Sequence, residues 1–365
     1  MSVCDVAPSY VRAIAPYEPG KPVSELAREI GLDASRIIKL ASNENPLGVS
    51  PFARRAIESV LGELARYPDG NGFELKQALH DRYGIPMETI VLGNGSNDVL
   101  DLAARAFLTS NDEAIYSQHA FAVYPLAVQA IGARGVEVPA RNYGHDLDAM
   151  RGAVTAKTRL VFIANPNNPT GTMLRSDALE AFIASIPDGV LVVLDEAYNE
   201  YLPREVAFDS LAWLERHANL VITRTFSKVY GLAGLRVGYA FASREVADLM
   251  NRVREPFNVN SVALAAAAAA LRDTEFVRRS HELNRAGMTQ VTSGLSVLRL
   301  EYIPSYGNFV SFRVKNAADV FRRLLECGVI VRPIAGYGMP DHLRVSIGLE
   351  SENARFLESL KQAIA

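Results

Sequence analysis

Short apolar segments alternate with helix-like segments through the middle of this 365-residue chain. No polar residue interrupts positions 190–194, which is typical of a strand buried on both faces. Alternation of this kind predicts an α/β fold in which helices cover both faces of a mostly parallel sheet. Strands are predicted at 89–92, 113–116, 134–138, 159–163, 190–194 and 219–222, and helices near 73–83, 97–108, 121–131, 146–153 and 176–185.

Beyond residue 290 the pattern changes to that of a smaller α+β domain. Strands are predicted there at 309–314, 329–332 and 343–347, with helices at 317–326 and 351–364. We expect the N-terminal segment to fold back and complete this small domain. The predicted division is therefore an N-terminal segment at 1–50, a large ligand-binding domain at 51–290 and a small C-terminal domain at 291–365.

Composition argues against several classes of protein. A net charge of −3 gives no general attraction to nucleic acid or to anionic membranes. The apolar run at 262–271 is shorter than the roughly 20 residues of a membrane span. Two cysteines, Cys4 and Cys327, supply neither a disulfide framework nor metal-ligand spacing, and the first 20 residues lack the apolar core of a signal peptide. We expect a cytoplasmic protein without a metal.

One lysine has neighbours that suggest chemistry. Lys228 follows the predicted strand at 219–222 and precedes three closely spaced glycines. A lysine amine removed from water has a lowered pKa and can attack an aldehyde. Ser227 and Arg236 offer a hydroxyl and a bidentate guanidinium, the groups that bind phosphate. A lone loop lysine is more often a solvated surface residue, so the interpretation depends on the rest of the chain.

Other polar residues follow the predicted strands at the edge where α/β sheets bind ligands. Asp195 ends the strand at 190–194 and would need a cationic partner, which a protonated pyridine nitrogen could supply. Asn168 lies in a proline-flanked loop and could donate to a ligand oxygen, and Tyr198 could place a phenol beside it. The alternatives are a helix N-cap for Asp195, a β-turn for Asn168 and a packed aromatic for Tyr198.

The Gly-Asn-Gly-Ser-Asn run at 93–97 lies between a predicted strand and a predicted helix, where backbone N–H groups form anion sites. It fails as a dinucleotide fingerprint because Asp98 stands where the third glycine would be. No Walker A motif is present either. These observations disfavour a nicotinamide dehydrogenase and a nucleotide triphosphatase.

Taken together, these residues resemble the fold-type I pyridoxal-phosphate enzymes of the aspartate aminotransferase-like superfamily. The resemblance implies a mostly parallel mixed sheet plus a small domain built from both chain ends. It implies that Lys228 bonds to the cofactor aldehyde and then carries a proton between the substrate Cα and C4′, and that Asp195 pairs with the ring nitrogen. Further cofactor contacts implied in the same way are Asn168 and Tyr198 at O3′, Phe121 on the ring face, and Ser96, Asn97, Thr225, Ser227, Arg236 and Tyr67 at the phosphate. Tyr67 would reach the cofactor of a second subunit, so the resemblance also implies a homodimer with shared active sites.

Within that superfamily the chain resembles the histidinol-phosphate aminotransferases, through the segments 16–22 and 40–46 and through Arg332 and Arg344. The resemblance implies that Tyr17, Arg332 and Arg344 hold the substrate phosphate, with Asn45 as a further substrate contact. It implies ping-pong transfer of an amino group between histidinol phosphate and 2-oxoglutarate, with glutamate as donor, in histidine biosynthesis.

The chain departs from that pattern at two positions: Phe121 stands where some relatives have tyrosine, and Asn97 where others have an acid. An aromatic amino acid aminotransferase or a threonine-phosphate decarboxylase-like enzyme of the same fold is therefore an alternative. A transcription regulator with an aminotransferase-like domain would need a helix-turn-helix unit that the first 50 residues cannot supply. Phe257 and Asn258 are candidates for the imidazole pocket, contributed by a second subunit.

Overall fold

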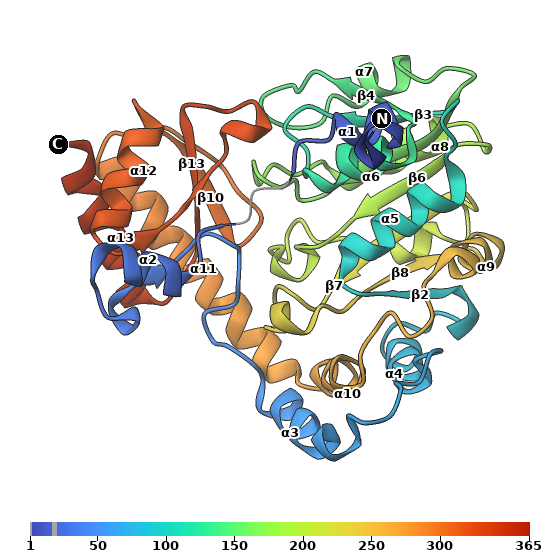
Figure 1. Ribbon diagram of the computed structural model, residues 1–365, viewed down its shortest axis with the longest axis horizontal. Coiled ribbons are helices and arrows are strands. Elements are labelled where there is room, and N and C mark those ends of the chain that lie inside the picture. The colour runs from blue at the N-terminus through green and yellow to red at the C-terminus, as the bar shows by residue number, and fades with distance from the viewer. Residues whose placement is uncertain (1, 17–19) are drawn as a thin grey trace.

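The computed structural model describes residues 2–16 and 20–365. Its largest sheet has seven strands in the order β2-β8-β7-β6-β5-β3-β4, and all run the same way except β8, which is antiparallel to both neighbours (Figure 1). The strands are β2 (Ile90–Gly93), β3 (Glu113–Ser117), β4 (Arg134–Val138), β5 (Thr158–Ala164), β6 (Leu191–Asp195), β7 (Leu220–Thr225) and β8 (Gly238–Ala242).

Both faces of this sheet are covered by helices because successive side chains of a buried strand point in opposite directions. In β6, Val192 and Leu194 enter one core cluster, whereas Leu191 and Val193 enter the other. Helices α3 (Pro51–Val60), α4 (Phe73–Tyr83), α7 (Leu147–Gly152), α8 (Ser176–Ser185) and α10 (Ser261–Ala270) contribute to the first cluster. Helices α5 (Ser96–Phe107), α6 (Val123–Ile131) and α9 (Arg244–Val253) contribute to the second.

A second sheet of four antiparallel strands lies beside the first in the order β12-β13-β10-β9 (Figure 1). Its strands are β9 (Tyr302–Ile303), β10 (Phe309–Arg313), β12 (Arg332–Pro333) and β13 (His342–Ser346), and its helices are α12 (Ala317–Glu326) and α13 (Glu350–Ile364). The long helix α11 (Thr274–Val297) begins near α10 and ends against this sheet, so the boundary predicted near residue 290 falls inside a continuous helix.

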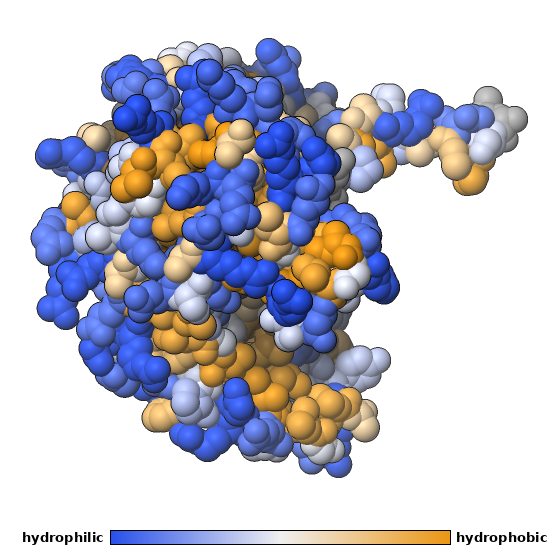
Figure 2. Space-filling model, turned by 90° about the vertical axis from the view of Figure 1, so that its left-hand side faces the viewer, coloured by the Kyte–Doolittle hydropathy of each residue, from blue (hydrophilic) through white to orange (hydrophobic). Residues whose placement is uncertain are grey.

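The N-terminal region divides its contacts between the two parts of the molecule. Strand β1 (Ile38–Lys39) pairs in parallel with β11 (Val329–Ile330), and α2 (Val23–Ile30) packs in the same small cluster. Helix α1 (Ser9–Arg12) instead contacts α6, and the segment before it projects away from the body (Figure 2). None of the helices in the described ranges combines the length and apolar character needed to cross a membrane.

The predicted strands of the parallel sheet are present, but β8 was not expected. Its first residue, Gly238, lies among the glycines that were interpreted as part of the lysine loop. A Cβ at Gly238 would lie 2.4 Å from the backbone nitrogen of Ser96, so glycine lets β8 approach the start of α5. Helices α9 and α11 were also not predicted from the sequence.

Candidate active site

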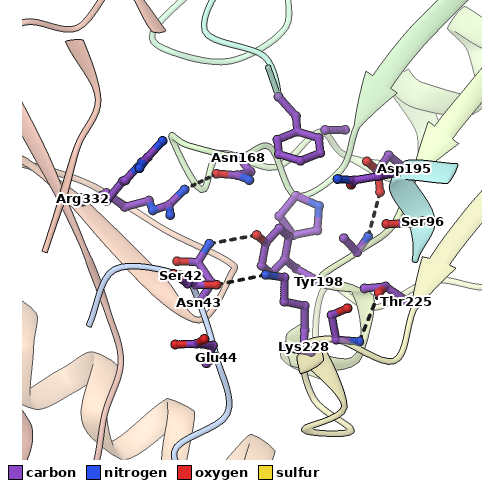
Figure 3. Close-up of a pocket in the computed structure, with 18 of the residues that line it drawn as sticks. Ser42, Asn43, Glu44, Ser96, Asn168, Asp195, Tyr198, Thr225, Lys228 and Arg332 are labelled. Atoms are coloured by element: carbon purple, nitrogen blue, oxygen red, sulfur yellow. Dashed lines mark hydrogen bonds between the residues drawn. The ribbon is translucent and has the colours of Figure 1, made fainter. Parts of the chain in front are cut away.

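A cavity of about 260 Å³ is lined from both sheets (Figure 3). The ends of β5, β6 and β7 contribute one wall, and β12 and β13 contribute another. Twelve of the residues predicted for the site line this cavity: Ser96, Asn97, Phe121, Asn168, Asp195, Tyr198, Thr225, Ser227, Lys228, Arg236, Arg332 and Arg344.

Lys228 lies just past the end of β7, with its amine inside the cavity (Figure 3). Its Nζ donates a hydrogen bond to the carbonyl oxygen of Ser42 (3.2 Å) and lies 5.6 Å from the centroid of the Tyr198 ring. Burial, followed by the positive charge of Arg344, lowers the pKa of Lys228 to about 8. A substantial share of this amine is therefore neutral near physiological pH.

Asp195 is the last residue of β6 and is 5% exposed. Its Oδ2 accepts a hydrogen bond from the Tyr124 hydroxyl (2.9 Å), and its Oδ1 accepts from the backbone N–H of Ala197 (3.2 Å) and from Thr223 Oγ1 (3.3 Å). Burial raises the pKa of Asp195, whereas these three donors lower it. Among residues 2–16 and 20–365, Asp195 has no lysine, arginine or histidine within ion-pair distance.

Tyr198 is buried beside Lys228, and burial raises the pKa of its phenol to about 12. The phenol accepts a hydrogen bond from Asn43 Nδ2 (2.9 Å), and the backbone N–H of Asn43 donates to Ser346 Oγ (2.8 Å). Asn168 points into the same space and accepts a hydrogen bond from Arg344 (Figure 3). Asn43 lies in the segment 40–46 but had no predicted role, because nothing local to residue 43 indicates a contact with residue 198.

A cradle for an anion forms where α5 begins. Arg236 Nη1 donates to Ser227 Oγ (3.2 Å) and to the carbonyl oxygen of Ala233 (3.1 Å). A Cβ at Gly95, where φ is +83°, would lie 2.3 Å from Arg236 Nη2, so only glycine admits the guanidinium so close to the helix. Ser96 opens α5, and backbone N–H groups at such a helix start attract anions.

A second cationic group faces the cavity from the small sheet. Arg332 and Arg344 are directly opposite each other on β12 and β13, and both line the cavity. Arg344 is buried, and its Nη2 donates to the carbonyl oxygen of Ala41 (2.9 Å). A guanidinium group is a planar, permanently charged fork that matches the geometry of a carboxylate or a phosphate. This wall therefore suits a phosphate or a carboxylate.

Asn45, predicted as a substrate contact, is placed elsewhere by the structure. Its Nδ2 donates to the carbonyl oxygen of Val229 and to Ser280 Oγ, both at 2.8 Å, and the residue does not line the cavity. Its amide ties the lysine loop to α11, so this geometry gives the predicted substrate contact no support. The segment 40–46 alone could not tell whether Asn43 or Asn45 lines the cavity.

Three other predicted residues also lie away from the cavity, namely Tyr67, Phe257 and Asn258. Tyr67 is 83% exposed and stacks on Phe257 with ring centroids 4.8 Å apart. Asn258 Nδ2 donates to the carbonyl oxygen of Leu92 (3.1 Å). Tyr17 lies outside the described residues.

Within the described part of the chain, no group of three or more His, Cys, Asp or Glu side chains could hold a metal ion.

The sheet order, the buried lysine and carboxylate, and the anion cradle together define an α/β enzyme of the aminotransferase class. The chain belongs to the family "Aminotransferase class I and II", whose pattern matches residues 35–360.

Three relatives illustrate how closely the chain follows one branch of this family. It is 62% identical to histidinol-phosphate aminotransferase 2 of Nitrosospira multiformis, over 100% of this chain and 93% of that protein. It is 64% identical to the histidinol-phosphate aminotransferase of Methylobacillus flagellatus, over 99% of this chain and 98% of that protein. The structure of histidinol-phosphate aminotransferase from Sinorhizobium meliloti in complex with pyridoxal-5'-phosphate is similar with a TM-score of 0.90, at 27% identity over 98% of this chain and 97% of that chain.

Proposed function

We propose that this chain is a pyridoxal-phosphate-dependent histidinol-phosphate aminotransferase, acting between histidinol phosphate and 2-oxoglutarate or glutamate in histidine biosynthesis. The relatives with 62% and 64% identity carry that name. The observation that carries the proposal is that one cavity contains Lys228, Asp195 and two separate cationic groups. One cationic group suits the phosphate of a cofactor, and the other suits the phosphate of a substrate.

The residues of the cavity fit pyridoxal phosphate. Asp195 is a buried carboxylate without a cationic partner among the described residues, and a protonated ring nitrogen would supply one. The cradle of Arg236, Ser227 and Ser96 would hold the phosphate, and Phe121 would cover a face of the ring. When bound, the cofactor supplies an electron-withdrawing ring that stabilises negative charge at the substrate Cα.

The chain's own residues position the substrate and move its proton. Lys228 Nζ, whose pKa is lowered to about 8, can accept a proton from the substrate Cα and return it, because both its states are accessible near neutral pH. The Tyr198 hydroxyl accepts from Asn43, so its own proton would be free to donate to a cofactor oxygen beside the lysine, and the amide nitrogen of Asn168 would donate to the same oxygen. Arg332 and Arg344 bind the phosphate of histidinol phosphate or a carboxylate of glutamate, which lets the two substrates alternate in one site.

The proposed enzyme is a homodimer with shared active sites. Tyr67 exposes its aromatic ring and contacts Phe257, so it is available to reach the phosphate bound by a second subunit. We also propose that 51–290 form the large domain and that 291–365 form the small domain with most of segment 1–50. Both cysteines are free thiols, which favours the reducing cytoplasm as the location.

The direct test is covalent capture of the cofactor. In the wild-type protein, borohydride treatment should fix pyridoxal phosphate to the chain, and peptide mapping should locate it at Lys228. Lys228→Ala should show no fixed cofactor and should lose about 10²- to 10⁴-fold in kcat, because no other amine lines the cavity in the described part of the chain. Lys157→Ala, at an exposed turn, is the matched control and should behave as wild type.

Substrate assignment requires a comparison of kcat/KM for histidinol phosphate and for phenylalanine. Histidinol phosphate should be preferred, and inorganic phosphate should inhibit its turnover competitively, because the Arg332–Arg344 wall binds the phosphate. Equal or better use of phenylalanine, without inhibition by phosphate, would assign the chain to the aromatic aminotransferases.

A further inference from the structure

Tyr124 lies behind the cavity wall and contacts the carboxylate proposed to hold the cofactor ring. It belongs to α6, its side chain is 0% exposed, and it does not itself line the cavity. Its hydroxyl donates to Asp195 Oδ2 at 2.9 Å. Ala197 and Thr223 both donate to the other oxygen, Oδ1. Within the described ranges, Tyr124 is therefore the one donor to Oδ2.

The ring of Tyr124 packs against two other aromatic rings. It stacks on Phe162 of β5 with centroids 4.7 Å apart and an interplanar angle of 5°. It also meets the ring of Phe121 edge to face, with centroids 6.0 Å apart and an angle of 88°. Phe121 lines the cavity. One buried side chain thus contacts both the carboxylate and the aromatic residue that are proposed to hold the same ring.

We propose that Tyr124 is a positioning residue: its hydroxyl keeps Asp195 charged and aimed at the cavity, and its ring supports Phe121. The inference rests on the proposed function, because it concerns the residues that would bind pyridoxal phosphate.

Charge and burial explain why the hydroxyl acts as a donor. Burial, followed by the nearby Asp195 charge, raises the pKa of Tyr124 well above its ordinary value, so the phenol keeps its proton. A hydrogen bond from a neutral phenol to a buried carboxylate is charge-assisted and favours the ionised acid. Without it, Asp195 would hold a proton more tightly and would stabilise a charged ring nitrogen less well.

The experiment compares Tyr124→Phe with Tyr116→Phe. The first removes the hydroxyl and keeps the ring on Phe162. The second removes a hydroxyl from another buried tyrosine of the same core cluster, on β3, which does not line the cavity. Three quantities are measured on each reconstituted protein: the affinity of the apoenzyme for pyridoxal phosphate, the pH midpoint of the bound cofactor's visible absorbance, and kcat/KM.

We expect Tyr124→Phe to bind the cofactor more weakly and to lose about 10- to 100-fold in kcat/KM, the range for a lost hydrogen bond to a charged group. The pH midpoint of the cofactor's absorbance should move upward. Without this hydrogen bond Asp195 stabilises less positive charge on the ring, and a less positive cofactor holds more tightly the proton whose loss changes the absorbance. Tyr116→Phe should match wild type in all three. Wild-type values of all three in Tyr124→Phe would overturn the proposal.

A double-mutant cycle separates action through Asp195 from a general packing effect. If Tyr124 acts through the carboxylate, Tyr124→Phe should change kcat/KM by less than about twofold in an Asp195→Asn background. An equally large loss in both backgrounds would contradict the inference. Failure of the proposed function would look different, because the wild-type protein would then have neither bound cofactor nor aminotransferase activity.

Discussion

Individual side chains in this site owe their chemistry to their surroundings. Lys228 has the same side chain as any other lysine, yet burial beside Arg344 lowers its pKa to about 8. The pKa of Tyr198, next to it, is instead raised to about 12. Burial penalises the charged form of each group, which is the protonated amine of the lysine but the deprotonated phenol of the tyrosine. The site therefore combines an amine that can lose its proton with a phenol that keeps it.

This difference predicts a pH dependence for cofactor capture. Only the neutral amine attacks an aldehyde, so the rate at which the apoenzyme bonds to pyridoxal phosphate should rise with pH and level off above a midpoint near 8. Stopped-flow absorbance between about pH 6.5 and 11.5 would measure it, a range that includes the ordinary lysine pKa. Arg344→Gln should move the midpoint upward, since a positive charge near the amine is removed. A midpoint near 10.5, the ordinary lysine value, would contradict the structure.

At the scale of elements, the site depends on how closely strand ends and helix starts approach one another. The start of α5 meets Arg236 at Gly95 and meets β8 at Gly238, and a Cβ at either position would overlap its neighbour. Asn43 shows the same dependence, because it brings the segment after β1 against Tyr198 and the end of β13. The anion cradle thus depends on α5, on β8 and on the segment that carries Arg236, and not on one loop alone.

Gly95→Ala tests this arrangement. The added methyl group would displace the Arg236 guanidinium and would strain a backbone with φ of +83°, so we expect affinity for pyridoxal phosphate to fall about tenfold or more, which corresponds to about 1.4 kcal/mol. Gly234→Ala is the control, because a Cβ there meets nothing within 4 Å. Titration of the two apoenzymes with cofactor provides the comparison. Equal affinities would show that the close approach at Gly95 does not matter.

At the scale of the whole molecule, large apolar side chains remain exposed near α3, α4 and Tyr67. Leu64 is 57% exposed, and Leu61, Phe73 and Phe257 are exposed as well. Figure 2 shows hydrophobic residues low on the molecule, at the height where Figure 1 places α3 and α10. Patches of this kind mark interaction surfaces, which supports the proposed homodimer.

Leu64→Glu should weaken this proposed interface, because a charge would be buried without a partner. Analytical ultracentrifugation should then report the mass of one chain instead of two. Cofactor affinity should fall in parallel, since Tyr67 could no longer reach a second site. Val297→Glu, at an 81% exposed position at the end of α11, is the control and should remain dimeric. A dimeric Leu64→Glu protein with unchanged cofactor affinity would place the interface elsewhere.

Much of this protein was predictable from the sequence alone. The alternation of strands and helices indicated the parallel sheet, and Lys228, Asp195 and Arg236 were identified by residue type and position after strands. These features are local, because a strand's periodicity and the polar residue that ends it lie within a few positions of each other. The sequence also predicted that Arg332 and Arg344 belong to a small C-terminal domain, and the structure pairs them on β12 and β13.

Only the tertiary structure decided which side chains meet. Tyr124 contacts Asp195 across 71 positions, and Asn43 contacts Tyr198 across 155. The same packing turned Asn45 away from the cavity and placed β8 antiparallel beside β7. Contacts of this kind depend on how whole elements pack and on where glycine lets backbones approach. No local pattern of residues encodes the packing or these close approaches.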